Sequence, residues 1–377
     1  MEVNVAYDTA IMIWQVAFVL AAVLQLYYFL WVHGKLAWHK PAASESPLPA
    51  VSVVIAARNE YDNLSANLPL ILDQDYPTFE VIVVNDRSLD DSASLLDTFK
   101  RSHPHLRVVH ISENEQHDGG KKFALTMGLK AASHDRVVLT DADCKPSGKN
   151  WIRAMVASAR AESDIVLGYS PYARKRGFLN AVIRFDSMHT AMNYLGFALA
   201  GNPYMGVGRN LSYSRSLFFE VGGYRKHYSL KSGDDDLFVN QVAHKANTSV
   251  CIRKEALMET TPETTWKAYW RQKRRHLTTG WKYRLSHRVL LLLQPLSLVV
   301  LLAASVALLL YGVWVIPVAA ALALRVLIQM AIYKRTSKWL GQGDLVFFAP
   351  LLEIVTLVFN TGVHLSNASR KQTRWKT

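Results

Sequence analysis

The chain has 377 residues, of which 50% are hydrophobic, and its formal net charge is +13. This length allows one large domain together with several apolar segments. Its two cysteines, Cys144 and Cys251, lie far apart in the sequence, which excludes a disulfide framework or a cysteine-based zinc motif and favours a reducing compartment. The basic charge alone would suit nucleic acid, but the sequence has no nucleic-acid-binding motif, so we expect no such partner.

The first apolar run covers residues 11–32 and contains no charged residue. It is long enough to cross a bilayer core of about 30 Å. A cleaved signal peptide fits poorly, because the run is long and is preceded by the acidic residues Glu2 and Asp8. Lys35 and Lys40 follow the run, so the positive-inside rule places the next segment in the cytoplasm. We therefore predict an N-terminal transmembrane helix and its flank in residues 1–40.

Residues 41–260 predict an α/β domain. Short β-branched runs alternate with helical patterns in this segment, with the runs at residues 51–56, 81–85, 107–111, 137–140 and 165–169 and the patterns at residues 59–72, 92–101, 121–132 and 151–161. Such alternation predicts a mostly parallel sheet that is covered by helices on both faces.

The last third of the chain combines basic and apolar stretches. Residues 266–288, within a segment 261–288, are rich in Trp, Tyr, Lys and Arg and predict an amphipathic helix at the membrane interface. In the C-terminal region 289–377, the runs 289–310 and 314–333 predict two spans. A third run, 345–365, is weaker because it contains Pro350, Glu353 and Asn360. As a span it would put the C-terminus outside, whereas the basic residues of the tail favour the inside, namely Arg370, Lys371, Arg374 and Lys376. Two to three C-terminal spans are therefore predicted, and a re-entrant or interfacial course of the third run stays open.

The strongest chemical signal is Asp141-Ala142-Asp143, directly after the predicted strand 137–140. Ligands bind at the carboxyl ends of strands in open α/β sheets. Magnesium and manganese take few protein carboxylates and complete their shells with water and phosphate oxygens. The pair therefore predicts a divalent metal on a nucleotide diphosphate, with an ordinary surface turn as the alternative.

Other pieces surround this pair in a characteristic order. The run Ala57-Arg58-Asn59-Glu60 follows the first predicted strand, Asp86 ends the second, and Gly120-Lys121 precedes a helical pattern. Together, from residue 50 to residue 283, these pieces resemble the family 2 glycosyltransferases. The resemblance implies the GT-A fold, which is a Rossmann-like mixed sheet, and the transfer of a sugar from a nucleotide-sugar.

The resemblance also implies a role for each matching residue. Nucleotide or donor contacts are implied for Ala57, Arg58, Asn59, Glu60, Asp86, Lys121 and Asp141. Asp141 and Asp143 would hold Mn²⁺ or Mg²⁺. Gly208 and Asn210 match a G-x-N segment that lines the pocket for donor and acceptor.

Three consecutive carboxylates, Asp234, Asp235 and Asp236, follow Gly233. Their mutual repulsion in a buried cleft raises the pKa of at least one of them, which suits a proton acceptor. The family places here the general base that deprotonates the acceptor hydroxyl in an inverting displacement. Alignment to a G-D-D pattern favours Asp235 and alignment to E-D-x-D-L favours Asp234. We predict Asp235.

Gln272, Arg275 and His276 resemble the Q-x-x-R-W motif of membrane-integrated family members. In that motif the arginine contacts the diphosphate, for which a planar guanidinium group is well suited. His276 replaces the tryptophan that helps to cap the acceptor site. The replacement leaves the donor contact intact and weakens any inference about the acceptor or about processivity.

The sequence thus predicts an integral protein of the bacterial inner membrane with a cytoplasmic, inverting hexosyltransferase domain. Its partners would be a nucleotide-sugar, by resemblance a UDP-sugar, membrane lipids, and a lipid or lipid-linked acceptor. A processive polysaccharide synthase is an alternative, although such proteins usually show more spans and an intact motif. A polyprenyl-phosphate sugar synthase is another, and commonly lacks the interfacial motif. An inactive membrane scaffold is the non-enzyme alternative, against which the retained Asp86, Asp141 and Asp143 argue.

Overall fold

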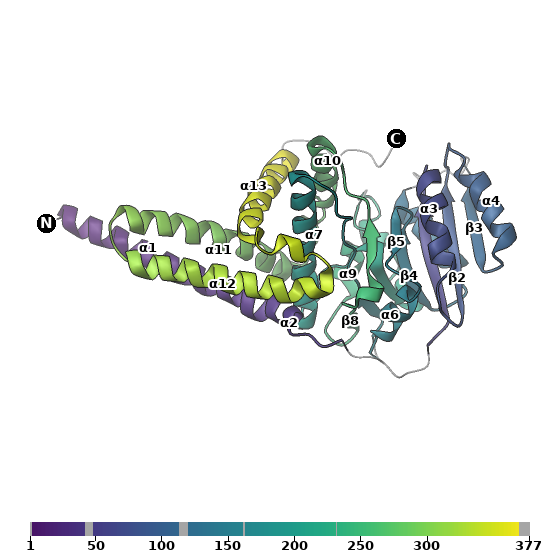
Figure 1. The fold of residues 1–377 in the computed structure, drawn as a ribbon, viewed down its shortest axis with the longest axis horizontal. Helices are drawn as coiled ribbons and strands as arrows, with labels where there is room; N and C mark the ends of the chain where they lie inside the picture. Colours follow the sequence, from purple (N-terminus) through teal and green to yellow (C-terminus); the bar gives the residue numbers. More distant parts are fainter. Residues whose placement is uncertain (1, 42–47, 113–119, 161–162, 231, 369–377) are drawn as a thin grey trace.

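The structure is a computed structural model and describes residues 2–41, 48–112, 120–160, 163–230 and 232–368. It confirms the α/β class of the domain and the presence of long apolar helices. Figure 1 shows two parts: the sheet with its flanking helices at the right, here called the sheet domain, and a group of long helices that project to the left.

The described residues form one mixed sheet of seven strands in the order β3-β2-β1-β4-β7-β6-β8. Its strands are β1 (Val51–Ala57), β2 (Phe79–Asp86), β3 (Leu106–Ile111), β4 (Arg136–Asp141), β6 (Ile165–Leu167), β7 (Leu211–Ser214) and β8 (Thr248–Val250). The first four run parallel, as predicted, whereas β7 is antiparallel to both β4 and β6. A small antiparallel sheet pairs β5 (Cys144–Pro146) with β9 (Met258–Thr260).

Helices cover both faces of the large sheet. One face carries α3 (Tyr61–Leu72), α4 (Ser92–Ser102) and α6 (Trp151–Ala157), and the other carries α5 (Lys121–Ala131), α7 (Phe178–Leu199) and α9 (Asp236–Val242). Successive residues of β1 serve the two faces in turn, with Val53 in one core and Val54 in the other. A Cβ atom on Gly128 would stand 2.6 Å from Val54 Cγ1, so glycine lets α5 lie close against β1.

The elements that the sequence predicted up to residue 157 are confirmed, with ends displaced by a few residues. The described elements that were not predicted include the long helix α7, the strands β7 and β8, and the short helix α8 (Arg215–Glu220). Fourteen of the 22 residues of α7 are buried, so its sequence lacks the polar face that marks a surface helix.

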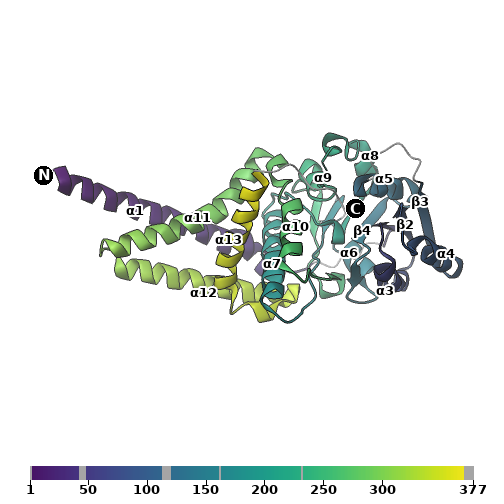
Figure 2. The same ribbon diagram turned by 90° about the horizontal axis from the view of Figure 1, so that it is seen from above.

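Four helical segments of the described chain are long and apolar enough to cross a membrane. The first is α1 (Glu2–Leu26), which continues through the π-helical turn Tyr27–His33 into α2 (Gly34–Ala37). The others are α11 (Leu285–Leu310), α12 (Val315–Leu340) and α13 (Ala349–Ala368). Figures 1 and 2 show α1, α11 and α12 side by side, and we call them the three-helix bundle.

The helix in the basic segment before α11 is shorter than the sequence predicted. Its helix α10 (Trp266–His276) ends twelve residues before the predicted limit at residue 288, and α11 already begins at Leu285. The buried Asp186 of α7 accepts hydrogen bonds from Tyr269 (2.8 Å) and Lys273 (2.7 Å) of α10 and from Asn360 (3.0 Å) of α13. These contacts hold α7, α10 and α13 together at the junction of the two parts.

Candidate active site

Parallel pairing brings the predicted site residues to one edge of the sheet. Ala56 in β1 lies opposite both Val84 in β2 and Asp141 in β4. Asp86 ends β2 and Asp141 ends β4, so both carboxylates flank the loop that follows β1. The carboxyl ends of parallel strands therefore gather Asp86, Asp141 and residues 57–60, as the sequence predicted.

The loops after β1 and β2 are pinned to each other. Asn59 adopts a left-handed conformation (φ 54°), which asparagine tolerates better than most residues. Its backbone N–H donates to Ser88 Oγ (3.0 Å), and its side-chain Oδ1 accepts from the N–H of Leu89 (2.7 Å). The backbone N–H of Tyr61 donates to Asp90 (3.0 Å). These bonds fix the loop that carries Arg58, Asn59 and Glu60 against the end of β2.

Asp86 is fully buried at the end of β2. One of its carboxylate oxygens, Oδ1, accepts a hydrogen bond from Arg87 Nε at 2.9 Å. The other, Oδ2, has no hydrogen-bond partner among the described residues. A buried oxygen in this state calls for a donor from outside the protein, because unsatisfied buried polar groups are costly. The geometry thus suits a ligand N–H group at Asp86.

Lys121 joins two parts of the site. Its Nζ lies 2.8 Å from Asp141 Oδ1 and 3.0 Å from Asp234 Oδ2. Burial opposes its charge, but Asp141, Asp234 and Asp235 together hold the pKa of Lys121 well above its usual value. The next residue, Lys122, donates to the carbonyl oxygens of His227 (2.6 Å), Leu230 (2.9 Å) and Ser232 (2.8 Å), and so anchors the chain that leads to Asp234.

Asp141 and Asp143 are the only residues to which the sequence assigned a metal. Asp143 accepts from Cys144 Sγ and from Thr260 Oγ1, each at 3.3 Å. Burial, and then the negative charge of Asp141, raise the pKa of Asp143. Two half-buried carboxylates this close in the sequence suit a cation between them. In the described chain, no group of three or more His, Cys, Asp and Glu side chains is placed to hold a metal. Ligand and water oxygens would have to complete the shell of a metal at this pair.

The three adjacent carboxylates have three different surroundings. Asp234 is paired with Lys121, which lowers its pKa against the opposing effect of burial. Asp235 caps α9: its Oδ1 accepts from the N–H of Asp236 (2.8 Å), and its Oδ2 accepts from the N–H of Gly208 (2.7 Å). Burial, followed by the charges of Asp234 and Asp236, raises the pKa of Asp235 to about 7. A pKa near 7 suits Asp235 to gain and lose a proton near neutral pH.

Asp236 turns away from this pair. Its Oδ1 accepts from the N–H of Leu237 (2.8 Å), and its Oδ2 accepts from the hydroxyl groups of Tyr283 (2.7 Å) and Thr279. Both hydroxyl groups belong to the segment between α10 and α11. Asp236 thus links the acidic cluster to the chain that enters α11.

A pocket brings five of the predicted residues together: Lys121, Asp141, Gly208, Asp234 and Asp235. Asn210 lies outside it and is fully buried. Its amide accepts from Trp151 Nε1 (3.0 Å) and donates to the carbonyl oxygens of Tyr169 (2.8 Å) and Ala256 (2.7 Å). The side-chain amide of Asn210 is therefore hydrogen-bonded within the protein and does not line the pocket.

Arg209 was missed by the sequence analysis, although it stands between Gly208 and Asn210. Its guanidinium group lies 4.7 Å from the centre of the Tyr172 ring. Burial opposes its charge, whereas Tyr172, Cys144, Asp143 and Asp141 raise the pKa of Arg209. The sequence shows a single arginine between Gly208 and Asn210. Its residue type alone does not reveal where the side chain points, so the sequence could not identify it as a site residue.

Helix α10 reaches the site through Tyr172. The Tyr172 hydroxyl donates to Gln272 Oε1 at 3.2 Å. Gln272 therefore lies beside the aromatic ring on which the Arg209 guanidinium group packs. Arg275 is half-buried, and its guanidinium group makes no hydrogen bond or ion pair with other residues that the structure describes. His276 ends α10 and is exposed. The motif-like residues thus approach the site from the side of the long helices.

Two family models match this chain. The model of glycosyl transferase family 2 matches residues 52–222, and that of glycosyl transferase family group 2 matches residues 151–348. Poly-beta-1,6-N-acetyl-D-glucosamine synthase of Staphylococcus epidermidis is 34% identical over 93 residues, which are 25% of this chain and 21% of the relative. The synthase of the same name from Staphylococcus aureus (strain MSSA476) is 34% identical over 104 residues, or 28% and 24%. The chain thus spans about a quarter of the length of these curated relatives.

A solved structure resembles nearly the whole chain. It is the mannosyltransferase PcManGT from Pyrobaculum calidifontis in complex with GDP-Man and Mn²⁺, with a TM-score of 0.61 and 20% identity. The match covers 96% of this chain and 99% of that one. This likeness confirms the GT-A arrangement of the sheet domain.

Proposed function

This chain belongs to glycosyl transferase family group 2 and is a glycosyltransferase, and we propose that it transfers a sugar with inversion from a UDP-sugar to a lipid or lipid-linked acceptor at a membrane surface. One observation carries the proposal: Asp235, whose pKa is raised to about 7, lines one pocket with Lys121 and Asp141. A proton acceptor thus stands next to the strand end where the family binds its donor.

In this mechanism Asp235 accepts the proton of the acceptor hydroxyl group. The acceptor oxygen forms a bond to the anomeric carbon as the bond from that carbon to the diphosphate breaks, and the nucleoside diphosphate leaves. Because the bond forms opposite the leaving group, the configuration inverts. The hydrogen bond from Gly208 to Asp235 Oδ2 holds the carboxylate in place for this step.

The remaining residues bind and orient the donor. Asp86 offers its unpaired Oδ2 to an N–H group of the base. Arg209 and Arg275 supply guanidinium groups for the diphosphate oxygens, for which their planar donors are suited. Asp141 and Asp143 would hold a divalent metal, Mn²⁺ or Mg²⁺, which when bound offsets the charge of the leaving diphosphate. The complex of the related fold with GDP-Man and Mn²⁺ supports such a metal.

The membrane acceptor is supported by the position of α10. This helix ties Gln272 to the site through Tyr172 and packs against α13, one of the long apolar helices. Arg271 and Arg274 lie on the same helix, where they would meet anionic headgroups. The catalytic domain would face the cytoplasm, because the basic residues Lys35 and Lys40 follow α1.

A second candidate is a polymer synthase, because the curated relatives are named as synthases of poly-beta-1,6-N-acetyl-D-glucosamine. The same pocket would serve repeated transfer onto a growing chain. The two candidates differ in the length of the product and agree on the roles of the site residues.

The test is a donor screen on the protein purified into nanodiscs. Release of nucleoside diphosphate is followed for a panel of UDP- and GDP-sugars, with Mn²⁺, Mg²⁺ or EDTA, and with or without extracted membrane lipids. The Asp235→Asn variant serves as the matched control. Release that needs one UDP-sugar, metal, lipid and Asp235 supports the proposal, and mass spectrometry of the product distinguishes one added sugar from a polymer. The absence of both turnover and nucleotide binding across the whole panel would reject the proposal in favour of an inactive scaffold.

A further inference from the structure

The segment before α13 and the second half of α13 contact the same turn of α7. Before α13, Asp344 accepts from Arg184 through two nitrogen atoms, at 2.9 and 2.5 Å. In the second half of α13, Asn360 donates to Asp186 at 3.0 Å. Arg184 and Asp186 are two positions apart on α7, and α7 packs on the sheet domain. The chain therefore passes α7 before α13 and returns to α7 within it.

The end of α13 lies on α10. Asn367 Oδ1 accepts from Arg274 Nε (3.0 Å), and Asn367 Nδ2 donates to the Arg274 carbonyl (2.9 Å). Phe359 stacks on Tyr269, with ring centres 5.0 Å apart and an angle of 15° between the rings. α10 is a strongly basic helix whose Gln272 contacts Tyr172 at the active site. The last residues of α13 thus lie on the side of the sheet domain.

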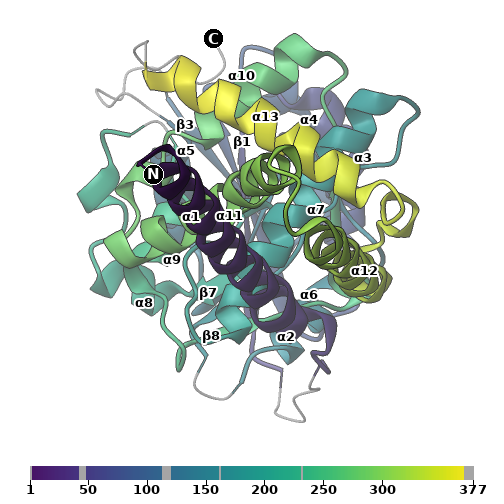
Figure 3. The ribbon, with the colours of Figure 1, turned by 90° about the vertical axis from the view of Figure 1, so that its left-hand side faces the viewer.

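The far side of the three-helix bundle is marked by Tyr7 and Tyr311. Their rings meet edge to face, 5.2 Å apart, where α1 begins and α11 ends. The 20 residues of α13 could extend about 30 Å, which is enough to reach that side. Instead the helix runs across the bundle: α13 is steeply inclined to α1, α11 and α12 in Figures 1 and 2, and Figure 3 shows it lengthwise while the bundle points toward the viewer.

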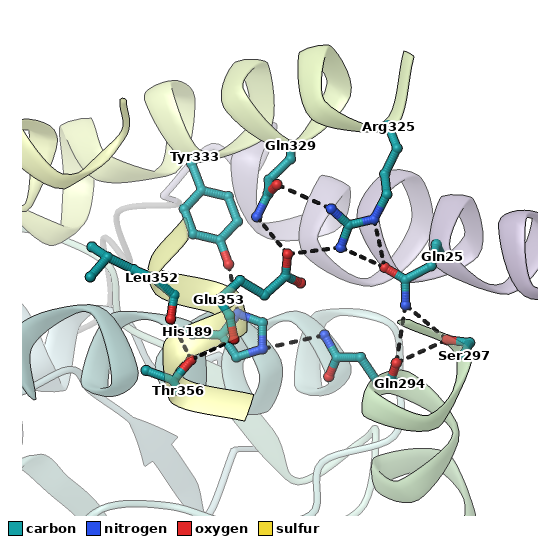
Figure 4. Close-up of polar contacts among 10 residues, drawn as sticks. All are labelled: Gln25, His189, Gln294, Ser297, Arg325, Gln329, Tyr333, Leu352, Glu353 and Thr356. Atoms are coloured by element: carbon teal, nitrogen blue, oxygen red, sulfur yellow. Dashed lines mark hydrogen bonds and ion pairs between the residues drawn. The ribbon is translucent and has the colours of Figure 1, made fainter. Parts of the chain in front are cut away.

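Near its start, α13 contacts the three-helix bundle through the charged side chain of Glu353. Glu353 Oε2 lies 2.8 Å from a guanidinium nitrogen of Arg325 in α12 and accepts from Gln329 Nε2 at 3.0 Å. Arg325 also donates to Gln25 of α1 at 2.8 and 3.0 Å. Figure 4 shows these side chains converging from three helices. Charges are costly inside a bilayer, so this buried pair fixes α13 at one depth in the bundle.

The outer face of α13 is apolar and exposed. Leu351, Ile354, Val358 and Leu365 recur at helical spacing on this face and are between 42% and 69% exposed. The opposite face buries Leu352, Glu353, Thr356 and Val363 against protein. An exposed apolar stripe beside helices that are long enough to span a membrane fits lipid as its partner.

From these contacts we propose that α13 is a re-entrant helix. It enters the bilayer from the side of the sheet domain, meets Arg325 through Glu353 and leaves on the same side, while its exposed stripe contacts lipid. The described chain therefore crosses the membrane three times, and Ala368 lies on the same side as the sheet domain. The basic residues that follow Ala368 in the sequence agree with this, because the positive-inside rule favours the side of Lys35 and Lys40. The inference does not depend on the sugar or the acceptor.

Three variants, each with one added cysteine, test this topology. Ala368→Cys reports on the end of α13, Glu220→Cys on the exposed surface of the sheet domain, and Leu310→Cys on the far end of the bundle, where Leu310 is 83% exposed. The wild-type protein is the blank, because Cys144 and Cys251 are buried. Each variant is treated with a membrane-impermeant maleimide in intact cells and in inverted membrane vesicles.

The expected result is that Ala368→Cys is labelled in the same preparation as Glu220→Cys and in the opposite one to Leu310→Cys. Labelling of Ala368→Cys together with Leu310→Cys would show that α13 spans the membrane and would overturn the proposal. If residue 368 does not react in detergent, a protease site added after Thr377 gives the same comparison. Cleavage from the side of Glu220 supports the re-entrant course, and cleavage from the side of Leu310 rejects it.

Discussion

The hydroxyl group of Tyr283 donates a hydrogen bond of 2.7 Å to Oδ2 of Asp236. This contact joins the acidic cluster, which contains the proposed base, to the segment that leads into α11. Asp236 also follows Asp235 directly and donates its backbone N–H to that carboxylate. A displacement of the segment between α10 and α11 would therefore move Asp236 and change the position of the Asp235 carboxylate.

The first prediction concerns this contact. Tyr283→Phe removes a hydrogen bond to a carboxylate, which is worth about 1.5–3 kcal/mol. We expect kcat to fall because Asp235 is held less firmly, while the Kd for the nucleotide stays unchanged because the donor residues are untouched. Steady-state kinetics and calorimetry measure the two quantities. Tyr228→Phe is the matched control, since Tyr228 is exposed. An unchanged kcat in Tyr283→Phe would show that the contact does not position the base.

The second prediction concerns pH. A general base must be deprotonated, and the pKa of Asp235 is raised to about 7. We therefore expect kcat/KM to rise with pH through this value and to level off above it. Asp234→Asn removes one of the charges that raise this pKa, so the rise should move to lower pH. Asp235→Asn should lower kcat by about 10²–10⁴-fold with near-normal donor binding. If Asp234→Asn alone behaves in that way, Asp234 is the base.

The third prediction concerns the metal. Asp143→Asn should abolish the part of nucleotide binding that depends on Mn²⁺ or Mg²⁺, because a single carboxylate holds these ions weakly. Calorimetry with UDP, with metal or with EDTA, measures this part directly. Asp62→Asn replaces an exposed carboxylate at the start of α3 and is the control. Metal-dependent binding that survives in Asp143→Asn would remove Asp143 from the metal site.

The fourth prediction concerns the buried pair at α13. Glu353→Ala leaves Arg325 without its anion inside the bundle, which should destabilise the protein by about 3–5 kcal/mol. The double variant Arg325→Met/Glu353→Leu removes both charges and should recover most of this loss. Thermal unfolding in nanodiscs provides the measurement, with the exposed Glu220→Gln as control. A double variant as unstable as Glu353→Ala would mean that packing, and not the unpaired charge, causes the loss.

Local pattern was sufficient for much of the fold. The strands β1 to β4 are short β-branched runs between helical patterns, so their parallel pairing followed from the alternation itself. In contrast, β7 is antiparallel and α7 is buried around most of its surface. Neither has the amphipathic periodicity that marks a surface element, because both are enclosed by segments distant in the sequence.

The sequence by itself determined that carboxylates stand at the ends of β2 and β4, because strand ends are set by local periodicity and parallel strands end at one edge. It also determined which segments are apolar enough to meet a membrane. Tertiary structure decided the different roles of residues that are adjacent in the sequence. Asp234, Asp235 and Asp236 differ through distant partners such as Lys121, Gly208 and Tyr283, and Glu353 meets the bundle through Arg325. The residue that pairs with a charged side chain depends on contacts between distant segments, and a local sequence pattern does not predict such contacts.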